Sequence, residues 1–343
     1  MNFRFVKSRL KRTIERGLAD GNLREQLREL GDLTLKSRTD GEDVCWGLQK
    51  LNSNSQQLAN HAYALALLFQ EVDDADSHAL EILRERGIPE LLRIFDQILQ
   101  APADDEINTL LFILKILALY GTTDGTLKVI ESAQRPLKPD GYMWTAILGN
   151  FQAGHPQNEL LYGSLSDPLP AEFIGVALLD AANAAMIAGE EMSHPFDSTE
   201  GRQRLRDWLS RRDPEDYSYA HSATAALPFI SNPEGDVLLN AAMSHPDVGV
   251  QIESAWAAAI RGRDEGLGRL AERCLDYRYS QQAKQYLKEL DREDVIPAEA
   301  NRPEFSTLAE FAQWLAHPNE LGRAPDEVEI VDQRELCWPP GKS

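Results

Sequence analysis

The sequence predicts an all-α fold, an α-solenoid of irregular helix pairs with a small helix-plus-strand appendage at its C-terminal end. Apolar residues recur at helical spacing along almost the whole chain, and short breaks rich in Gly and Pro separate these stretches. Strand-like alternation is nearly absent before residue 325. Because short connections make successive helices antiparallel neighbours, the pattern favours stacked helix pairs over a fold that contains a sheet.

The first residues predict helices that cap the array. Residues 5–18 have the pattern of a basic amphipathic helix, and a second apolar stripe precedes a polar break at 37–43. The apolar positions are Val6, Leu10, Ile14 and Leu18 in the first stripe, and Leu23, Leu27 and Leu30 in the second. Such helices cover the apolar face that the end of a repeat array would otherwise expose.

Helical patterns then follow one another as far as residue 290. Their predicted ranges are 43–52, 55–71, 76–86, 88–99, 104–119, 123–134, 139–151, 157–165, 171–188, 199–212, 215–229, 235–244, 247–261, 264–275 and 279–290. We interpret Gly87, Ile88 and Pro89 as a break between two of these helices. The most apolar stretch, residues 110–120, is interrupted by Lys115 and is too short to cross a bilayer, so it predicts a buried core helix.

One motif recurs in the second half of the chain. Asp213, Asp247 and Asp276 each open a segment that places small residues on one helical face, and they are 34 and 29 residues apart. The residues on these faces are Ala220, Ala223 and Ala226, then Ile252, Ala255 and Ala259, then Ala283 and Leu287. A period in this range is typical of stacked helix pairs.

The middle copy, residues 245–275, resembles a HEAT-type repeat. An Asp precedes its first helix, a Val lies in the first turn, Ala residues follow, and a Gly precedes a second helix that carries Leu. The matching positions are Asp247, Val250, Ala255, Ala258, Gly262, Leu267 and Leu270. Gln251 stands where the family usually has Arg, which puts the family's Asp–Arg contact between repeats in doubt. The resemblance is weaker over 214–244 and 277–292, and it implies a protein-binding scaffold.

The C-terminal segment changes character. Residues 305–316 predict an amphipathic helix, and residues 328–338 alternate like a strand. The helical stripe consists of Phe305, Leu308, Phe311 and Leu315. Because a lone strand is not stable, it pairs elsewhere in the chain, pairs with another chain in a homo-oligomer, or forms half of a hairpin in a natural protein that continues past Ser343. We favour the last of these.

We therefore expect three parts: capping helices over 1–40, the solenoid over 41–300, and the appendage over 301–343. The net charge is −20, although residues 1–38 hold ten Lys and Arg against five Asp and Glu. An acidic body repels phosphate backbones, so we expect no nucleic-acid partner and instead a protein partner of basic character.

Three cysteines, Cys45, Cys274 and Cys337, are far apart and match no metal-binding or disulfide spacing, which favours reduced thiols and a cytoplasmic setting. No apolar run is long enough to predict a membrane span.

The sequence offers little for catalysis, and we predict no catalytic residue, cofactor or metal. His155, His194, His245 and His317 each precede Pro, which places them in turns or at helix ends. Glu191 and His194 have the Glu-x-x-His spacing of carboxylate-bridged metal sites, but they fall in a loop and have no second copy.

Two pairs of tyrosines are candidates for contact with a partner: Tyr217 with Tyr219, and Tyr277 with Tyr279. They lie near equivalent positions of neighbouring repeats, and tyrosine is common at interfaces. The competing interpretation is that they pack between helices.

The function we expect is that of a non-catalytic scaffold for protein–protein interaction. The alternative is a HEAT-like enzyme or enzyme subunit, similar to the bilin lyases, with a small-molecule pocket. A deep pocket lined by acidic groups, His or Arg would favour that alternative.

Overall fold

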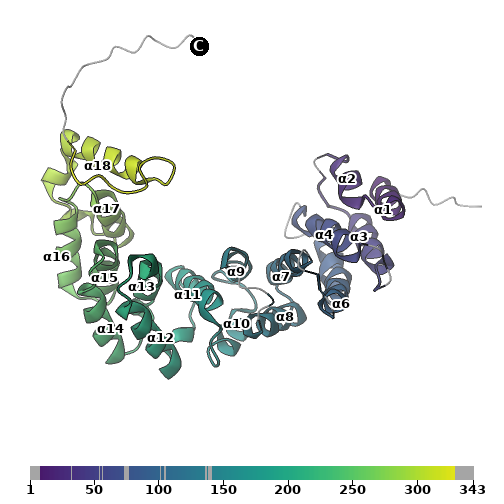
Figure 1. The fold of residues 1–343 in the computed structure, drawn as a ribbon, viewed down its shortest axis with the longest axis horizontal. Helices are drawn as coiled ribbons and strands as arrows, with labels where there is room; N and C mark the ends of the chain where they lie inside the picture. Colours follow the sequence, from purple (N-terminus) through teal and green to yellow (C-terminus); the bar gives the residue numbers. More distant parts are fainter. Residues whose placement is uncertain are drawn as a thin grey trace, which may run out of the picture. The chain divides into compact units, whose positions relative to one another are not determined.

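The computed structural model describes residues 8–31, 33–53, 55, 57–72, 77–100, 102–103, 106–135, 137 and 141–328 (Figure 1). Over these residues the chain is helical from end to end and forms no strand, and an isolated parallel bridge joins Leu35 to Val72. The prediction of an all-α fold is confirmed. The chain divides into two compact units, Met1–Arg204 and Leu205–Ser343. The predicted limits at residues 40 and 300 stay predictions.

The N-terminal unit contains eleven α-helices and the first part of a twelfth within its described residues. They are α1 (Arg9–Asp20), α2 (Leu23–Arg28), α3 (Arg38–Lys50), α4 (Leu58–Leu67), α5 (His78–Ile82), α6 (Ile88–Leu99), α7 (Ile107–Tyr120), α8 (Thr123–Gln134), α9 (Gly141–Leu148), α10 (Asn158–Ser164), α11 (Glu172–Ile187) and α12 (Thr199–Ser210), the last of which crosses the limit between the units.

The core of this unit forms around α7. Leu110, Leu114 and Leu117 are fully buried there, and the helix contacts α4, α6, α8 and α9. Burial of apolar area at about 25 cal/mol per Å² makes such an all-round apolar helix a major source of stability. The prediction of a buried core helix is confirmed.

Two predicted breaks are wrong. Helix α3 already begins at Arg38, because Ser37 and Asp40 form a reciprocal capping box in what looked like a polar break. The chain also stays helical through Gly87: residues 83–87 form one π-helical turn that joins α5 to α6. Pro89 has no backbone N–H to donate to the preceding turn, and a π turn accommodates this loss without ending the helix.

The C-terminal unit continues with six α-helices in its described part. They are α13 (Tyr217–Ala225), α14 (Glu234–Met243), α15 (Val248–Ile260), α16 (Asp264–Arg273), α17 (Ser280–Glu289) and α18 (Pro303–Ala316). Within this unit α13, α15 and α17 lie in one row, and α14 and α16 lie in the neighbouring row (Figure 1). Helix α15 contacts all the other helices of the two rows, namely α13, α14, α16 and α17.

The recurring aspartates occupy equivalent places in this unit. Each accepts a hydrogen bond from a backbone N–H two or three residues further along: Asp213 from Glu215, Asp247 from Val250 and Asp276 from Arg278, at 3.2, 2.9 and 3.1 Å. Asp213 and Asp247 thereby cap the helical segments that follow them, whereas Arg278 lies in the turn before α17. Of the residues that follow them, Ala220, Ala223, Ala226, Ile252, Ala255, Ala283 and Leu287 are buried. Asp213 and Asp247 satisfy backbone donors that the start of a helix leaves free, and the small side chains let neighbouring helices approach.

The predicted C-terminal helix is present as α18. The predicted strand over 328–338 lies outside the described residues apart from Val328, which belongs to no strand. None of the described helices is both long enough and apolar enough to span a membrane.

Candidate protein-binding surface

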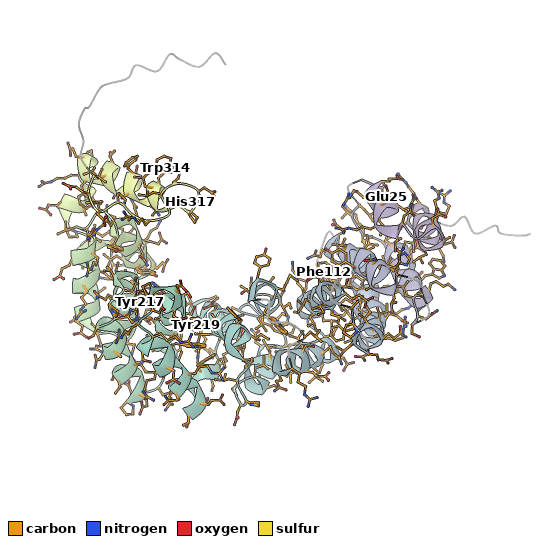
Figure 2. All side chains as sticks on the ribbon, viewed as in Figure 1. Glu25, Phe112, Tyr217, Tyr219, Trp314 and His317 are labelled. Carbon is orange, nitrogen blue, oxygen red and sulfur yellow. The ribbon has the colours of Figure 1, made fainter. Side chains whose placement is uncertain are left out.

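The outer face of α18 carries two exposed aromatic side chains. Phe311 is 45% exposed and Trp314 is 53% exposed, and their ring centroids are 5.7 Å apart. Ala309 and Ala312 on the same helix are buried, and α18 contacts α17. Positions two residues apart differ by about 200° around a helix, so Phe311 and Trp314 lie opposite the buried alanines. We call Phe311 and Trp314 the α18 patch (Figure 2 labels Trp314).

The chain after α18 turns back. The backbone N–H of Leu321 donates to the carbonyl of Leu315 at 3.0 Å, and Gly322 adopts a left-handed conformation with φ of 74°. The hydroxyl of Tyr277 donates to the carbonyl of Asp326 at 2.8 Å, which fixes this returning segment beside the start of α17. Leu321 is itself exposed, so the turn adds apolar surface next to the helix.

The first tyrosine pair lies on α13 (Figure 2). The Tyr217 ring packs edge-on against His245 at 4.9 Å, and the Tyr219 ring lies 5.7 Å from the buried ring of Trp208. The guanidinium of Arg211 lies 4.4 Å from the centre of the Tyr219 ring. Both tyrosines are half-buried, so each has an internal packing role and an accessible edge.

The second pair lies just before α17. Tyr277 holds the returning segment through Asp326, and the Tyr279 ring lies 5.5 Å from the guanidinium of Arg278. Arg278 in turn is held by Asp276, whose pKa is lowered mainly by this hydrogen-bonded pair. Each pair of tyrosines thus contacts neighbouring residues of the C-terminal unit. A role in binding a partner stays a prediction for all four, Tyr217, Tyr219, Tyr277 and Tyr279.

The four histidines that precede Pro share one arrangement. In each, Nδ1 accepts a hydrogen bond from the backbone N–H two residues further along. The pairs are His155 with Gln157 at 3.3 Å, His194 with Phe196 at 3.2 Å, His245 with Asp247 at 3.1 Å and His317 with Asn319 at 3.3 Å. The interpretation of these residues as turn and helix-end elements is confirmed, and in His194 the other ring nitrogen, Nε2, lies 3.0 Å from Oδ1 of Asn183.

A polar hollow of about 610 Å³ lies beside α14. Its lining includes Arg261 and Asp236, whose side chains form an ion pair at 3.1 Å. Arg261 also donates to the carbonyls of Leu227 and Ile230 at 3.0 and 2.8 Å, and to the side chain of Asn232. Because its donors bind these neighbours, Arg261 acts as a structural tie and offers no free group for catalysis.

Burial changes the acidity of three further groups, one carboxyl and two thiols. Burial raises the pKa of Glu253, and the hydrogen bond from the Tyr286 hydroxyl partly offsets this. Burial likewise raises the pKa of the Cys45 and Cys274 thiols to about 11, which disfavours the reactive thiolate. In the described part of the chain, no cluster of three or more His, Cys, Asp or Glu side chains is arranged to hold a metal ion.

Sequence reasoning missed the α18 patch because it placed Phe311 with Phe305, Leu308 and Leu315 on the one apolar stripe of an amphipathic helix. The signal was present: Trp314 cannot lie on the same face as Ala309 and Ala312, so the helix is apolar on two sides. Only the contact with α17 shows that the side with the small residues is the buried one.

Comparison of the chain with protein-family models, with curated proteins and with solved structures finds no match. The fold and the site described above therefore carry the functional argument by themselves.

Proposed function

We propose that the protein is a non-catalytic interaction scaffold, an α-solenoid of HEAT-like helix pairs that recognises another protein. Helices of the C-terminal unit contact their near neighbours in sequence, as α15 does with α14 and α16, and α17 does with α16 and α18. Packing of this kind is typical of repeat proteins, which use their extended surfaces for binding.

The observation that carries the proposal is the α18 patch. Trp and other aromatic residues dominate the energetics of protein interfaces, and two of them in contact on an exposed helix face form a natural anchor. A single exposed apolar residue is ordinary, but an adjacent Phe and Trp expose enough apolar area to make a covering partner favourable.

The surroundings of the patch indicate the chemistry of the partner. Glu304, Glu310 and Glu320 are exposed on and after α18, and the helix itself contains no Lys or Arg. Arg323 nearby in sequence is paired with Asp326. A partner with apolar side chains flanked by basic residues would complement this surface.

The experiment is quantitative affinity purification from the source cell, with the wild-type chain, the double variant Phe311→Ser/Trp314→Ser and the control Val237→Ser. Val237 is an exposed apolar residue on α14, so the control removes apolar surface elsewhere. We expect a defined protein to be retained by the wild type and the control, and to be lost from the double variant. Equal retention by all three would contradict the role of the patch.

A four-fold Ala substitution of Tyr217, Tyr219, Tyr277 and Tyr279 tests the tyrosine pairs in the same assay. Retention of the partner by a folded four-fold variant would remove these tyrosines from the binding surface. The enzymatic alternative has less support, since the side chains of Arg261 and Glu253 are engaged in contacts within the fold.

A further inference from the structure

The exposed half of α1 carries three arginines on one side of the helix. Successive residues of a helix are about 100° apart, so Arg9, Arg12 and Arg16 fall within about 60° of one another, and all three are exposed. The opposite half packs against α2 and α3 (Figure 1). Its buried residues are Leu10, Ile14 and Gly17. The helix therefore presents a stripe of guanidinium groups to the solvent.

Two lysines and a tryptophan extend this basic surface onto α3. The ammonium group of Lys11 lies 4.9 Å from the centre of the Trp46 ring, and that of Lys50 lies 5.5 Å from it. The ring is half-buried, and such cation–π contacts position the ammonium groups without neutralising their charge. We call these residues together the α1/α3 face: Arg9, Lys11, Arg12, Arg16, Trp46 and Lys50.

The arginines of the α1/α3 face are available to a partner. None of the three forms an ion pair with another residue that the structure describes, and Arg12 donates through Nε to the carbonyl of Ser8 at 3.3 Å. Most arginines of the C-terminal unit, in contrast, pair with a carboxylate. In a chain with 55 Asp and Glu, three adjacent arginines without such a partner are an exception.

The acidic side chains near the face do not cancel its charge. On α3, Glu42 pairs with Arg38 at 3.1 Å, and the buried carboxylate of Asp43 accepts a hydrogen bond from the hydroxyl of Ser8. On α1, the carboxylates are those of Glu15 and Asp20, against the five cations of the face. The face therefore keeps an excess of positive charge.

The helix that carries the arginines is held firmly in place. Ser8 caps α1 by accepting from the backbone N–H of Lys11 at 2.9 Å, and its hydroxyl joins α1 to α3. A Cβ atom on Gly17 would lie 2.6 Å from the Cα atom of Leu23, so α1 and α2 pack too closely there for a larger side chain. Because a fixed helix has little conformational freedom to lose on binding, the guanidinium groups are preorganised.

We propose that the α1/α3 face binds an acidic peptide segment of a partner protein. Arg9 and Arg16 are seven residues apart, which is about 10.5 Å along the helix axis. Three carboxylates on the same side of an extended peptide span about 13 Å, a distance that the long arginine side chains accommodate. Each carboxylate then pairs with one guanidinium group through charge-assisted hydrogen bonds.

The extent of the positive charge favours a peptide over a larger polyanion. Residues 1–38 hold ten of the 35 Lys and Arg of the chain but only five of its 55 Asp and Glu, so the remaining chain is strongly acidic. A nucleic acid or an anionic bilayer extends beyond the face and meets this acidic remainder. A bilayer also takes up the apolar side of an amphipathic helix, and the apolar side of α1 is buried within the fold.

This site differs in chemistry from the α18 patch. The patch is apolar with acidic surroundings and belongs to the C-terminal unit, whereas the α1/α3 face is basic and belongs to the N-terminal unit. Sites of opposite charge let one chain hold two different partner segments. The proposal stands whether or not the α18 patch binds a protein.

Fluorescence anisotropy on the full chain tests the proposal, with a fluorescein-labelled peptide of alternating Glu and Ser as the probe. We expect the wild type to bind this peptide, to bind it more weakly as NaCl is added, and not to bind the corresponding peptide of Gln and Ser. Arg9→Gln/Arg12→Gln/Arg16→Gln should weaken binding about tenfold, because several exposed ion pairs are lost together. Gln is a good helix former, and circular dichroism checks that the fold persists.

A matched control removes the same charge elsewhere. Arg84, Arg135 and Arg212 are exposed outside the face, and Arg84→Gln/Arg135→Gln/Arg212→Gln should bind the peptide as the wild type does. The Phe311→Ser/Trp314→Ser chain should also bind it, which keeps this test separate from that of the α18 patch.

Three results would overturn the proposal. The first is a wild type that does not bind the Glu peptide, and the second is equal weakening by the two triple variants, which would reflect net charge alone. The third is tighter binding of an oligothymidylate or of phosphatidylserine vesicles that is lost in the Arg9→Gln/Arg12→Gln/Arg16→Gln chain, because the face would then serve another polyanion.

Discussion

The Nε2 atom of His194 lies 3.0 Å from Oδ1 of Asn183 in the interior of the N-terminal unit. Because Nδ1 of the same ring accepts the backbone N–H of Phe196, the neutral ring carries its proton on Nε2 and donates it to Asn183. Burial lowers the pKa of His194 to about 4, and the nearby Asp197 carboxylate opposes this only partly. The ring thus ties the segment before α12 to α11 as long as it is neutral.

This geometry predicts a loss of stability in mild acid. A histidine whose folded-state pKa lies below its unfolded value of about 6.5 stabilises the fold fully above that pH, and the contribution is lost as the pH falls toward 4. We expect the free energy of unfolding to drop by about 2 kcal/mol between pH 7.5 and pH 5.0 from this residue. Urea unfolding at the two pH values measures it.

The matched variants for this experiment are His194→Gln and His78→Gln. His78 is exposed at the start of α5, so its replacement should leave the pH dependence as it is in the wild type. The His194→Gln chain should be less stable at pH 7.5 and should lose less on acidification. An unchanged pH dependence in His194→Gln would refute the assignment.

Two of the recurring aspartates, Asp247 and Asp213, should differ in how much they contribute to the free energy of unfolding. Asp247 accepts from Val250 and also pairs with His221 at 3.1 Å, whereas Asp213 is exposed and makes a longer bond to Glu215. Asp247→Ala should cost about 1–2 kcal/mol in the free energy of unfolding, and Asp213→Ala clearly less. Thermal and chemical denaturation of the two variants measure the difference, and an equal or reversed cost would count against the cap.

The contribution of Arg261 to the stability of the fold should depend on the shape of its guanidinium group as well as on its charge. Its side chain is 11% exposed and reaches two carbonyls and two side chains, which the single ammonium of lysine cannot reproduce. Arg261→Lys should destabilise the fold by about 2 kcal/mol, because it leaves buried carbonyls without donors. Arg263→Lys, at a more exposed position in the same hollow, is the control and should have a small effect. The idea fails if the two substitutions cost the same.

The thiols predict slow chemical labelling. Cys45 and Cys274 are fully buried, and their raised pKa values disfavour the thiolate. In a Cys337→Ser chain, a thiol-specific reagent should therefore react at neutral pH only after denaturant is added. Fast labelling of the native Cys337→Ser chain would show that one of these cysteines is accessible.

The fold class was predictable because it depends on periodicity alone. Leu110, Leu114 and Leu117 are buried as the apolar run predicts, and Asp247 caps its helix as the recurring motif predicts. The π turn before Pro89 was not predictable, since a glycine followed two residues later by a proline usually indicates a break, and the chain here stays helical through both.

The candidate sites depend on tertiary contacts between helices, and such contacts cannot be deduced from the periodicity of the sequence. The burial of Ala309 rather than Phe311 is decided by how α18 meets α17. The meeting of Lys11 with Trp46 on one face requires that α1 and α3 pack together, and their distance in sequence gives no sign of this.

The most direct test of the central proposal is hydrogen–deuterium exchange of the chain alone and in complex with the protein that affinity purification recovers. The account predicts slower exchange in peptides that cover α18 (Pro303–Ala316), with α14 (Glu234–Met243) unchanged. A complex that protects other helices and leaves α18 exchanging as in the free chain would contradict it.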